Sequence, residues 1–430
     1  MIKKIIYLFS TNKSYYYVLI GLFASAILSF SSTVLIARNF KPEEYGLFFS
    51  LLTLAMLFAN LNVSGIPLYL QDLISKNIFK KNSYYGKILL LIILLFSVIY
   101  YLFYFLWIFY GPNDDLNILI LYIFSCLIIF QPFIEMSKAL LQIDSQFKKL
   151  SILNFLINLL RFLSLIFLVL YFSKFLNLLN VSYVFVASAV IPFFISIYIF
   201  FNYFNINLSN FYKFEKNMLR GLKNSLINIK FYFSSNIIYF IFISTDILVI
   251  KYFLSDFHAG IFFASFSIIM GMQLFSEATV RTFSYQYFQK SKFNKNKLKM
   301  FLKKNILFLL NISIPICICI FFFSELIINI LYGENYKYSS KILKILIFIV
   351  PLKLIATNLS LLVITIKKSL YNTVAMFIIT SFKIPLMILL ISYFDLIGAV
   401  FSLIIIEIFY LIILNFIINK HFFLKRTIYG

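Results

Sequence analysis

The sequence is poor in acidic and metal-binding side chains. Its 430 residues include only 15 Asp and Glu, two His and three Cys. His258 and His421 lie outside the long apolar segments, whereas Cys126, Cys317 and Cys319 lie inside predicted helices. These positions favour neither a histidine-based site nor a disulfide or cysteine–metal framework. P-loop, GxGxxG, CxxC and HExxH patterns are also missing, so we expect no cofactor, no metal site and no soluble-enzyme chemistry.

Charged residues are scarce as well, and apolar residues dominate. The charged fraction is 12%, about half the ~25% usual in soluble domains, and 62% of residues are hydrophobic. A membrane-spanning helix needs about 20 predominantly apolar residues. The sequence therefore predicts an all-α integral membrane protein with twelve transmembrane helices, at residues 15–37, 47–70, 88–110, 116–141, 150–172, 180–201, 231–253, 260–282, 305–330, 342–366, 371–393 and 396–418.

The net charge of +23 is distributed unevenly over the predicted loops. With the N-terminus inside, 26 basic residues fall in inner segments and six in outer loops. This asymmetry predicts that both termini are cytoplasmic. We interpret the positive charge as a topology signal and an attraction for anionic lipid, and we expect no nucleic-acid partner.

No predicted loop is long enough to form a folded domain. The longest connection, 202–230, has apolar residues at helical spacing with basic residues between them. This pattern predicts an amphipathic helix on the cytoplasmic membrane surface. We therefore divide the chain into an N-terminal six-helix lobe (1–201), a connector (202–230) and a C-terminal six-helix lobe with a basic tail (231–430).

Short patterns recur in the two predicted lobes. Arg38 and Lys251 follow similar Ser-Thr segments, and Gly46 and Gly260 open the helices that come next. The two pairs are separated by nearly the same length of chain. Both halves begin on the same side, so such a repeat is parallel, related by an axis along the membrane normal. It predicts two pseudo-symmetric lobes with a transport site between them.

Charges near the centre of a span are the candidate site residues, because a central cation costs roughly 2.5 kcal/mol or more. Arg161 lies near the middle of 150–172 and Lys353 near the middle of 342–366, and neither has an opposite charge in its own helix. These cations suit a pyrophosphate or an anionic sugar, to which arginine can donate two parallel hydrogen bonds. The alternative is that Arg161 bonds only to helix carbonyls, asparagines or tyrosine hydroxyls. Aromatic and Asn-rich faces, such as those with Asn154, Asn158, Tyr239 and Asn358, could contact sugars.

Lys383 and Glu407 lie at similar depth in the last two predicted spans. Antiparallel neighbours at equal depth can form an ion pair, which is either structural or opens when substrate or an ion competes for one member. Asp246 has only Lys251 nearby, so Asp246, and Glu407 if unpaired, could carry a coupling H⁺ or Na⁺. Two further pairs are local, because their members are close in sequence at helical spacing: Glu135 with Lys138, and Glu277 with Arg281.

Several segments carry a resemblance to a known family. They are 36–46 (IARNFKPEEYG), 245–254 (TDILVIKYFL) with 259–262, 331–336 (LYGENY), and Gly398-Ala399 near the start of the last span. In this order, and with twelve spans, the chain resembles bacterial polysaccharide flippases of the O-antigen type. These belong to the superfamily of multidrug, oligosaccharidyl-lipid and polysaccharide exporters.

The resemblance implies two six-helix lobes around a central cationic cavity in the bacterial inner membrane. It also implies the substrate, an undecaprenyl-pyrophosphate-linked oligosaccharide moved from the cytoplasmic to the periplasmic leaflet by alternating access, as in lipopolysaccharide synthesis. Glycosyltransferases and a polysaccharide polymerase would be partners, together with membrane lipid. The candidate substrate-binding residues are Arg161, Lys353, Lys383 and Arg38, and the candidate ion-coupling or charge-pair residues are Asp246, Glu407 and Glu277.

Other functions stay open at this point. A drug or cation antiporter of the same superfamily would need an anionic cavity, whereas the charges here lean positive. A peptidoglycan-precursor flippase would share the architecture. A membrane glycosyltransferase or polysaccharide polymerase usually needs a large external loop, and the acidic pairs Glu43-Glu44 and Asp114-Asp115 lie in short ones. We therefore expect a transporter and not an enzyme.

Overall fold

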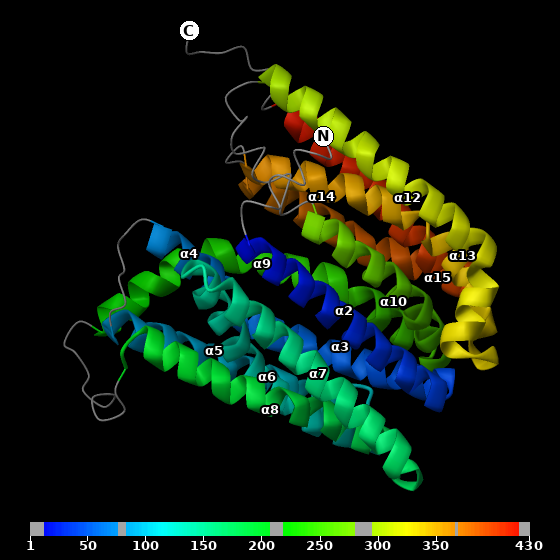
Figure 1. The fold of residues 1–430 in the computed structure, drawn as a ribbon, viewed down its shortest axis with the longest axis horizontal. Helices are drawn as coiled ribbons and strands as arrows, with labels where there is room; N and C mark the ends of the chain where they lie inside the picture. Colours follow the sequence, from blue (N-terminus) through cyan, green and yellow to red (C-terminus); the bar gives the residue numbers. More distant parts are fainter. Residues whose placement is uncertain (1–12, 76–82, 207–217, 280–294, 366–368, 421–430) are drawn as a thin grey trace. The chain divides into compact units, whose positions relative to one another are not determined.

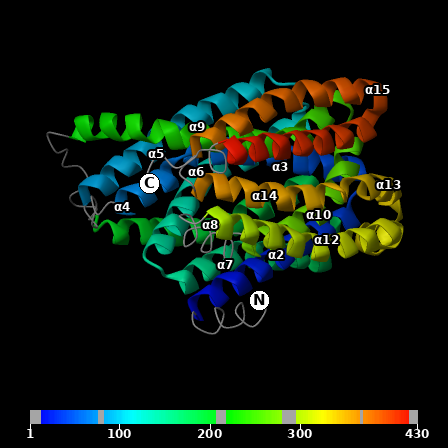
Figure 2. The same cartoon turned by 90° about the horizontal axis from the view of Figure 1, so that it is seen from above.

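The computed structural model describes residues 13–75, 83–206, 218–279, 295–365 and 369–420. In these ranges the chain folds into helices and short connections, without a strand (Figures 1 and 2). In chain order the helices are α2 (Lys13–Asn39), α3 (Pro42–Val63), α4 (Ile66–Ser75), α5 (Ser83–Tyr110), α6 (Asp115–Ile143), α7 (Phe147–Tyr171), η1 (Ser173–Phe175), α8 (Leu178–Tyr203), α9 (Met218–Phe253), α10 (Asp256–Thr279), α12 (Lys295–Tyr332), η4 (Glu334–Tyr336), α13 (Lys337–Leu346), α14 (Ile349–Thr365) and α15 (Ser369–Ile418).

The all-α membrane architecture predicted from the sequence is confirmed, and each of the twelve predicted spans overlaps a helix. Within the described ranges, nine helices are long and apolar enough to cross a membrane, or ten if the bent pair of α13 and α14 counts as one span. One of the nine, α15, covers the last two predicted spans, and its helical geometry is interrupted at Asp395 (φ 51°). α15 therefore consists of two helices that meet at Asp395, between the two predicted spans.

Two predicted elements differ from the structure. The span 47–70 is broken into α3 and α4 at Gly65, which has φ 78° and packs against the α9 backbone at Phe233. Both the positive φ and the close approach require glycine at this position. The connector 202–230 is not a separate element in its described part, because 218–230 form the beginning of α9. Its residues 207–217 lie outside the described ranges.

Backbone contacts divide the chain into two compact units. The first contains Met1–Leu35 and Leu51–Phe240, and the second contains Ile36–Ser50 and Ile241–Gly430. The end of α2 and the beginning of α3 therefore belong with the second unit, while the rest of these helices belongs with the first.

The first unit has a buried apolar cluster contributed by α4, α5, α6, α8 and α9. In the same unit, Pro132 interrupts the hydrogen bonding of α6, because proline lacks the N–H that would bond the carbonyl of Ile128. Asn62 of α3 supplies the missing donor, with its Nδ2 2.8 Å from the Ile128 oxygen, and also donates to Ser97 of α5 at 2.8 Å. One buried amide thus joins three helices at a proline.

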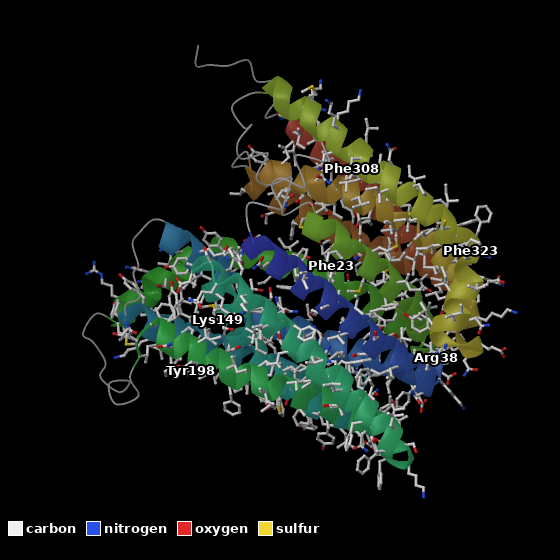
Figure 3. All side chains as sticks on the ribbon, viewed as in Figure 1. Phe23, Arg38, Lys149, Tyr198, Phe308 and Phe323 are labelled. Carbon is white, nitrogen blue, oxygen red and sulfur yellow. The ribbon has the colours of Figure 1, made fainter. Side chains whose placement is uncertain are left out.

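The second unit has its own apolar cluster, formed mainly by α14 and α15. Many large apolar side chains on the helices are exposed, among them Tyr198 and Phe323 (Figure 3). Exposed aromatic residues in this number suit a lipid environment, in which the outer faces of helices are apolar.

Candidate functional site

Arg161 lies near the middle of α7 in the first unit. Its guanidinium carbon is 4.3 Å from the centre of the Phe185 ring on α8. Arg161 has no ion pair or hydrogen bond among the residues that the structure describes, and its Nε is buried without a partner. The predicted alternative, bonds to carbonyls, asparagines or tyrosines, is therefore not observed. A cation–π contact contributes about 0.5–2 kcal/mol, less than the cost of a central cation, so an anion is still favoured here.

A row of hydrogen-bonded polar residues between α7 and α2 lies next to Arg161. Asn158 donates from Nδ2 to Oγ of Ser25 at 2.6 Å, and Ser25 donates to the carbonyl oxygen of Asn154 at 3.1 Å. Asn154, Asn158 and Arg161 follow each other at helical i,i+4 and i,i+3 spacing, which places them on one face of α7. The sequence indicated Asn154 and Asn158, but nothing in it singled out Ser25, whose part depends on how α2 packs.

Lys383 and Asp246 form a buried ion pair in the second unit. The Lys383 side chain is 1% exposed, and its Nζ lies 2.5 Å from Oδ1 of Asp246 on α9. Lys383 also donates to the carbonyl oxygen of Phe242 at 2.5 Å and lies 4.1 Å from the centre of that ring. The predicted pairing of Lys383 with Glu407 as direct partner is wrong, because α9 brings a carboxylate closer than the neighbouring arm of α15 does.

Glu407 instead has Lys353 as its nearest cation, with 3.9 Å between Nζ and Oε1. Glu407 is buried, whereas the Lys353 side chain is 25% exposed and makes a long 3.5 Å hydrogen bond to Gln273. Glu407 interacts electrostatically with Lys353 and Lys383 alike. Asp246, Lys353, Lys383 and Glu407 thus form a four-charge cluster with zero net charge, in which Lys353 is the member least tightly held.

Arg38 lies at the end of α2 (Figure 3) and bonds to α12. Its guanidinium donates to the carbonyl oxygen of Leu331 from Nε at 3.0 Å, and also to that of Ile330. These carbonyls belong to the last turn of α12, which has no helical donors and carries partial negative charge, so a cation stabilises it. The contact gives Arg38 a structural role at a helix end, and its binding of substrate stays a prediction.

The remaining candidate charges pair locally. Glu135 and Lys138 form the predicted ion pair at 2.8 Å. Lys251, the only cation near Asp246 in the sequence, instead lies 2.9 Å from Asp256 at the beginning of α10. The side chain of Glu277 and the whole of Arg281 lie outside the described residues.

Comparison with known families decides the affiliation of the chain. A family model described as "Polysaccharide biosynthesis protein" matches residues 11–280. The chain belongs to this polysaccharide biosynthesis family. No curated protein sequence matches the chain.

Several solved transporters share the fold of this polysaccharide biosynthesis protein. The Lipid II flippase MurJ, in an inward closed conformation, has a TM-score of 0.73 at 18% identity, covering 94% of this chain and 87% of MurJ. A multidrug resistance MATE family transporter of the MOP superfamily has a TM-score of 0.64 at 15% identity, covering 92% and 95%. A MOP superfamily transporter from Pyrococcus furiosus, described as having a binding pocket of reverse polarity, has a TM-score of 0.59 at 14% identity, covering 96% and 97%. The protein is thus a multi-pass membrane protein with a transporter fold.

Proposed function

We propose that this protein is a flippase for an oligosaccharide linked through pyrophosphate to undecaprenol. It moves this lipid from the cytoplasmic to the periplasmic leaflet of the bacterial inner membrane by alternating access, with both termini in the cytoplasm. Arg161 carries the proposal, because it is a cation in the middle of a span with no described anionic partner. A site that keeps such a cation is built for an anionic ligand.

The physical demands of the reaction match this residue. The polyisoprenyl tail stays in lipid, while the pyrophosphate and the sugars cross along a polar path. Removing a pyrophosphate from water is costly, and a guanidinium that offers two parallel N–H groups offsets the cost. Lys353 is the second cation to which we assign substrate binding, since its contacts are long: 3.9 Å to Glu407, 3.5 Å to Gln273 and 5.4 Å to the centre of the Phe266 ring. Lys383 is paired, so we assign it mainly a structural role.

The charge balance argues against a drug or cation exporter. Every carboxylate of the four-charge cluster has a lysine neighbour, so it offers no unbalanced negative charge to a cationic drug. A flippase for a peptidoglycan precursor is the second candidate, because the Lipid II flippase MurJ has a similar fold. The match to a polysaccharide biosynthesis family favours an O-antigen or related glycan. Glycosyltransferases would then supply the substrate, and a polysaccharide polymerase would consume the product.

The test is transport by the purified full chain in liposomes. The substrate is undecaprenyl pyrophosphate carrying a fluorescently labelled oligosaccharide, and its arrival in the outer leaflet is measured with a quencher that does not cross the bilayer. We expect the wild type to translocate the lipid and Arg161→Ala to lose most of this activity. Lys149→Ala, which removes an exposed cation from the beginning of the same helix, is the matched control and should stay active. Wild-type rates in Arg161→Ala would overturn the proposal.

A further inference from the structure

Asn158 lies beside Arg161 with its amide held in one orientation. The hydroxyl of Ser25 gives its only proton to the carbonyl oxygen of Asn154, at 3.1 Å. It can therefore only accept from Asn158, so the atom of Asn158 that faces Ser25 at 2.6 Å must be the donor Nδ2. This bond chain turns the amide oxygen, Oδ1, away from α2.

The amide oxygen of Asn158 and the guanidinium of Arg161 are both left with unused bonding capacity. Among the described residues, Oδ1 of Asn158 accepts no hydrogen bond and Arg161 donates none. Neither side chain is fully buried, so each can meet a ligand. The two residues are three positions apart on α7, about 4.5 Å along the helix axis. One face of α7 thus presents several N–H donors next to the amide oxygen of Asn158.

We propose that Asn158 binds the first sugar of the substrate, which is the sugar joined directly to the pyrophosphate. This inference rests on the proposed function. The phosphate oxygens can only accept hydrogen bonds, and Arg161 only donates them. The sugar carries a hydroxyl or an acylamido N–H on the carbon next to its linkage, and this group donates to Oδ1 of Asn158. The sugar then lies on the side of Arg161 that faces the beginning of α7.

Ser25 is the positioning residue of this subsite. Without its hydroxyl, the Asn158 amide is free to rotate and can present Nδ2 where Oδ1 is needed. Polar side chains between membrane helices also hold the helices together, at about 1–2 kcal/mol each. If the role is purely structural, removing the side chain weakens the binding of every substrate. If the role is sugar binding, removing it weakens only the binding of substrates that carry a sugar.

Two lipids separate these roles. One is undecaprenyl pyrophosphate, and the other is undecaprenyl pyrophosphate carrying a single N-acetylglucosamine, with binding of each to the full chain measured in lipid nanodiscs. Asn158→Ala should bind the sugar-bearing lipid about tenfold more weakly, as expected for one lost hydrogen bond, and the sugar-free lipid as well as wild type does. Ser25→Ala should show a smaller loss of the same kind. Lys149→Ala, which removes an exposed side chain from the beginning of the same helix, should bind both lipids normally.

The outcomes distinguish this inference from the function on which it rests. Equal weakening of both lipids by Asn158→Ala, or no weakening of either, would overturn the role of Asn158. Arg161→Ala should weaken both lipids alike, and unchanged binding in that variant would instead overturn the proposed function. Thermal unfolding of each variant, measured alongside, shows that the protein is folded.

Discussion

Gly46 and Gly260 touch each other through their backbones. They are the glycines at matching positions of the two similar sequence segments. A Cβ on Gly46 would collide with the carbonyl oxygen of Asp256 and the nitrogen of Gly260, and a Cβ on Gly260 would collide with the carbonyl oxygen of Pro42 and the nitrogen of Gly46. Pro42 precedes Gly46 by the same number of positions as Asp256 precedes Gly260. The contact is therefore reciprocal, as at a two-fold axis between like surfaces.

An aromatic pair beside the glycines follows the same pattern. Phe49 stacks on Phe263 with ring centres 4.2 Å apart and planes at 19°. Each phenylalanine comes at the same distance along the chain after its own glycine. The short sequence similarity alone supported an internal repeat only weakly. Equivalent residues that meet across a reciprocal contact support it independently.

The crossing of α3 and α10 should tolerate no side chain at either glycine. We expect Gly46→Ala and Gly260→Ala each to lower stability by about 1–3 kcal/mol, because a methyl group would force two backbones apart. Thermal unfolding of the full chain in detergent measures this loss. Gly271→Ala is the matched control in α10, since a Cβ there meets nothing within 4 Å. Similar melting temperatures for all three variants would contradict the close crossing.

Arg161 should be needed for glycan export but not for folding. We predict that Arg161→Ala abolishes export in cells while leaving the protein in the membrane, and that Arg161→Lys restores part of it, because lysine keeps the charge without the bidentate geometry. Surface polysaccharide and membrane protein levels are measured together. Normal surface polysaccharide in the alanine variant would remove Arg161 from the mechanism.

The Lys383–Asp246 pair should behave as one unit. Removing one partner leaves an uncompensated buried charge, so Lys383→Met and Asp246→Asn should each cost about 3–5 kcal/mol, while the double variant should recover most of the loss. A double-mutant cycle on thermal stability measures the coupling. The same cycle with Lys383→Met and Glu407→Gln should give a smaller coupling energy. A larger coupling of Lys383 to Glu407 than to Asp246 would show that Glu407 is the main partner of Lys383.

The bond from Asn62 to the Ile128 carbonyl should matter because of Pro132. Asn62→Leu leaves that buried carbonyl without a donor and should cost about 1–3 kcal/mol. Pro132→Ala restores the helical N–H, so Asn62→Leu should cost less in that background. Melting temperatures of the four proteins test this, and an equal cost in both backgrounds would show that Asn62 acts elsewhere.

Much of the fold was predictable because membrane helices depend on local sequence. A span is a run of about 20 apolar residues, and each predicted run overlaps a helix in the structure. The family segments and the central position of Arg161 are equally local, so they could be read directly. The break at Gly65 was missed although Ser64, Gly65 and Pro67 interrupt the apolar run, because the apolar segments on either side were taken as one span. The positive φ of Gly65 and the approach of α9 explain the glycine.

The partners of the charged residues were beyond such local reasoning. Depth along a helix can be counted from the sequence, and it placed Lys383 level with Glu407. The direction in which a side chain points depends on how the helices rotate and pack. This packing places Lys383 next to Asp246, on a helix much earlier in the chain, and Ser25 next to Asn158. The sequence by itself therefore determined the membrane class, the helices and the family. The tertiary structure decided which central charges cancel and that Arg161 is left without an anionic partner among the described residues, because electrostatic pairing depends on distance in space.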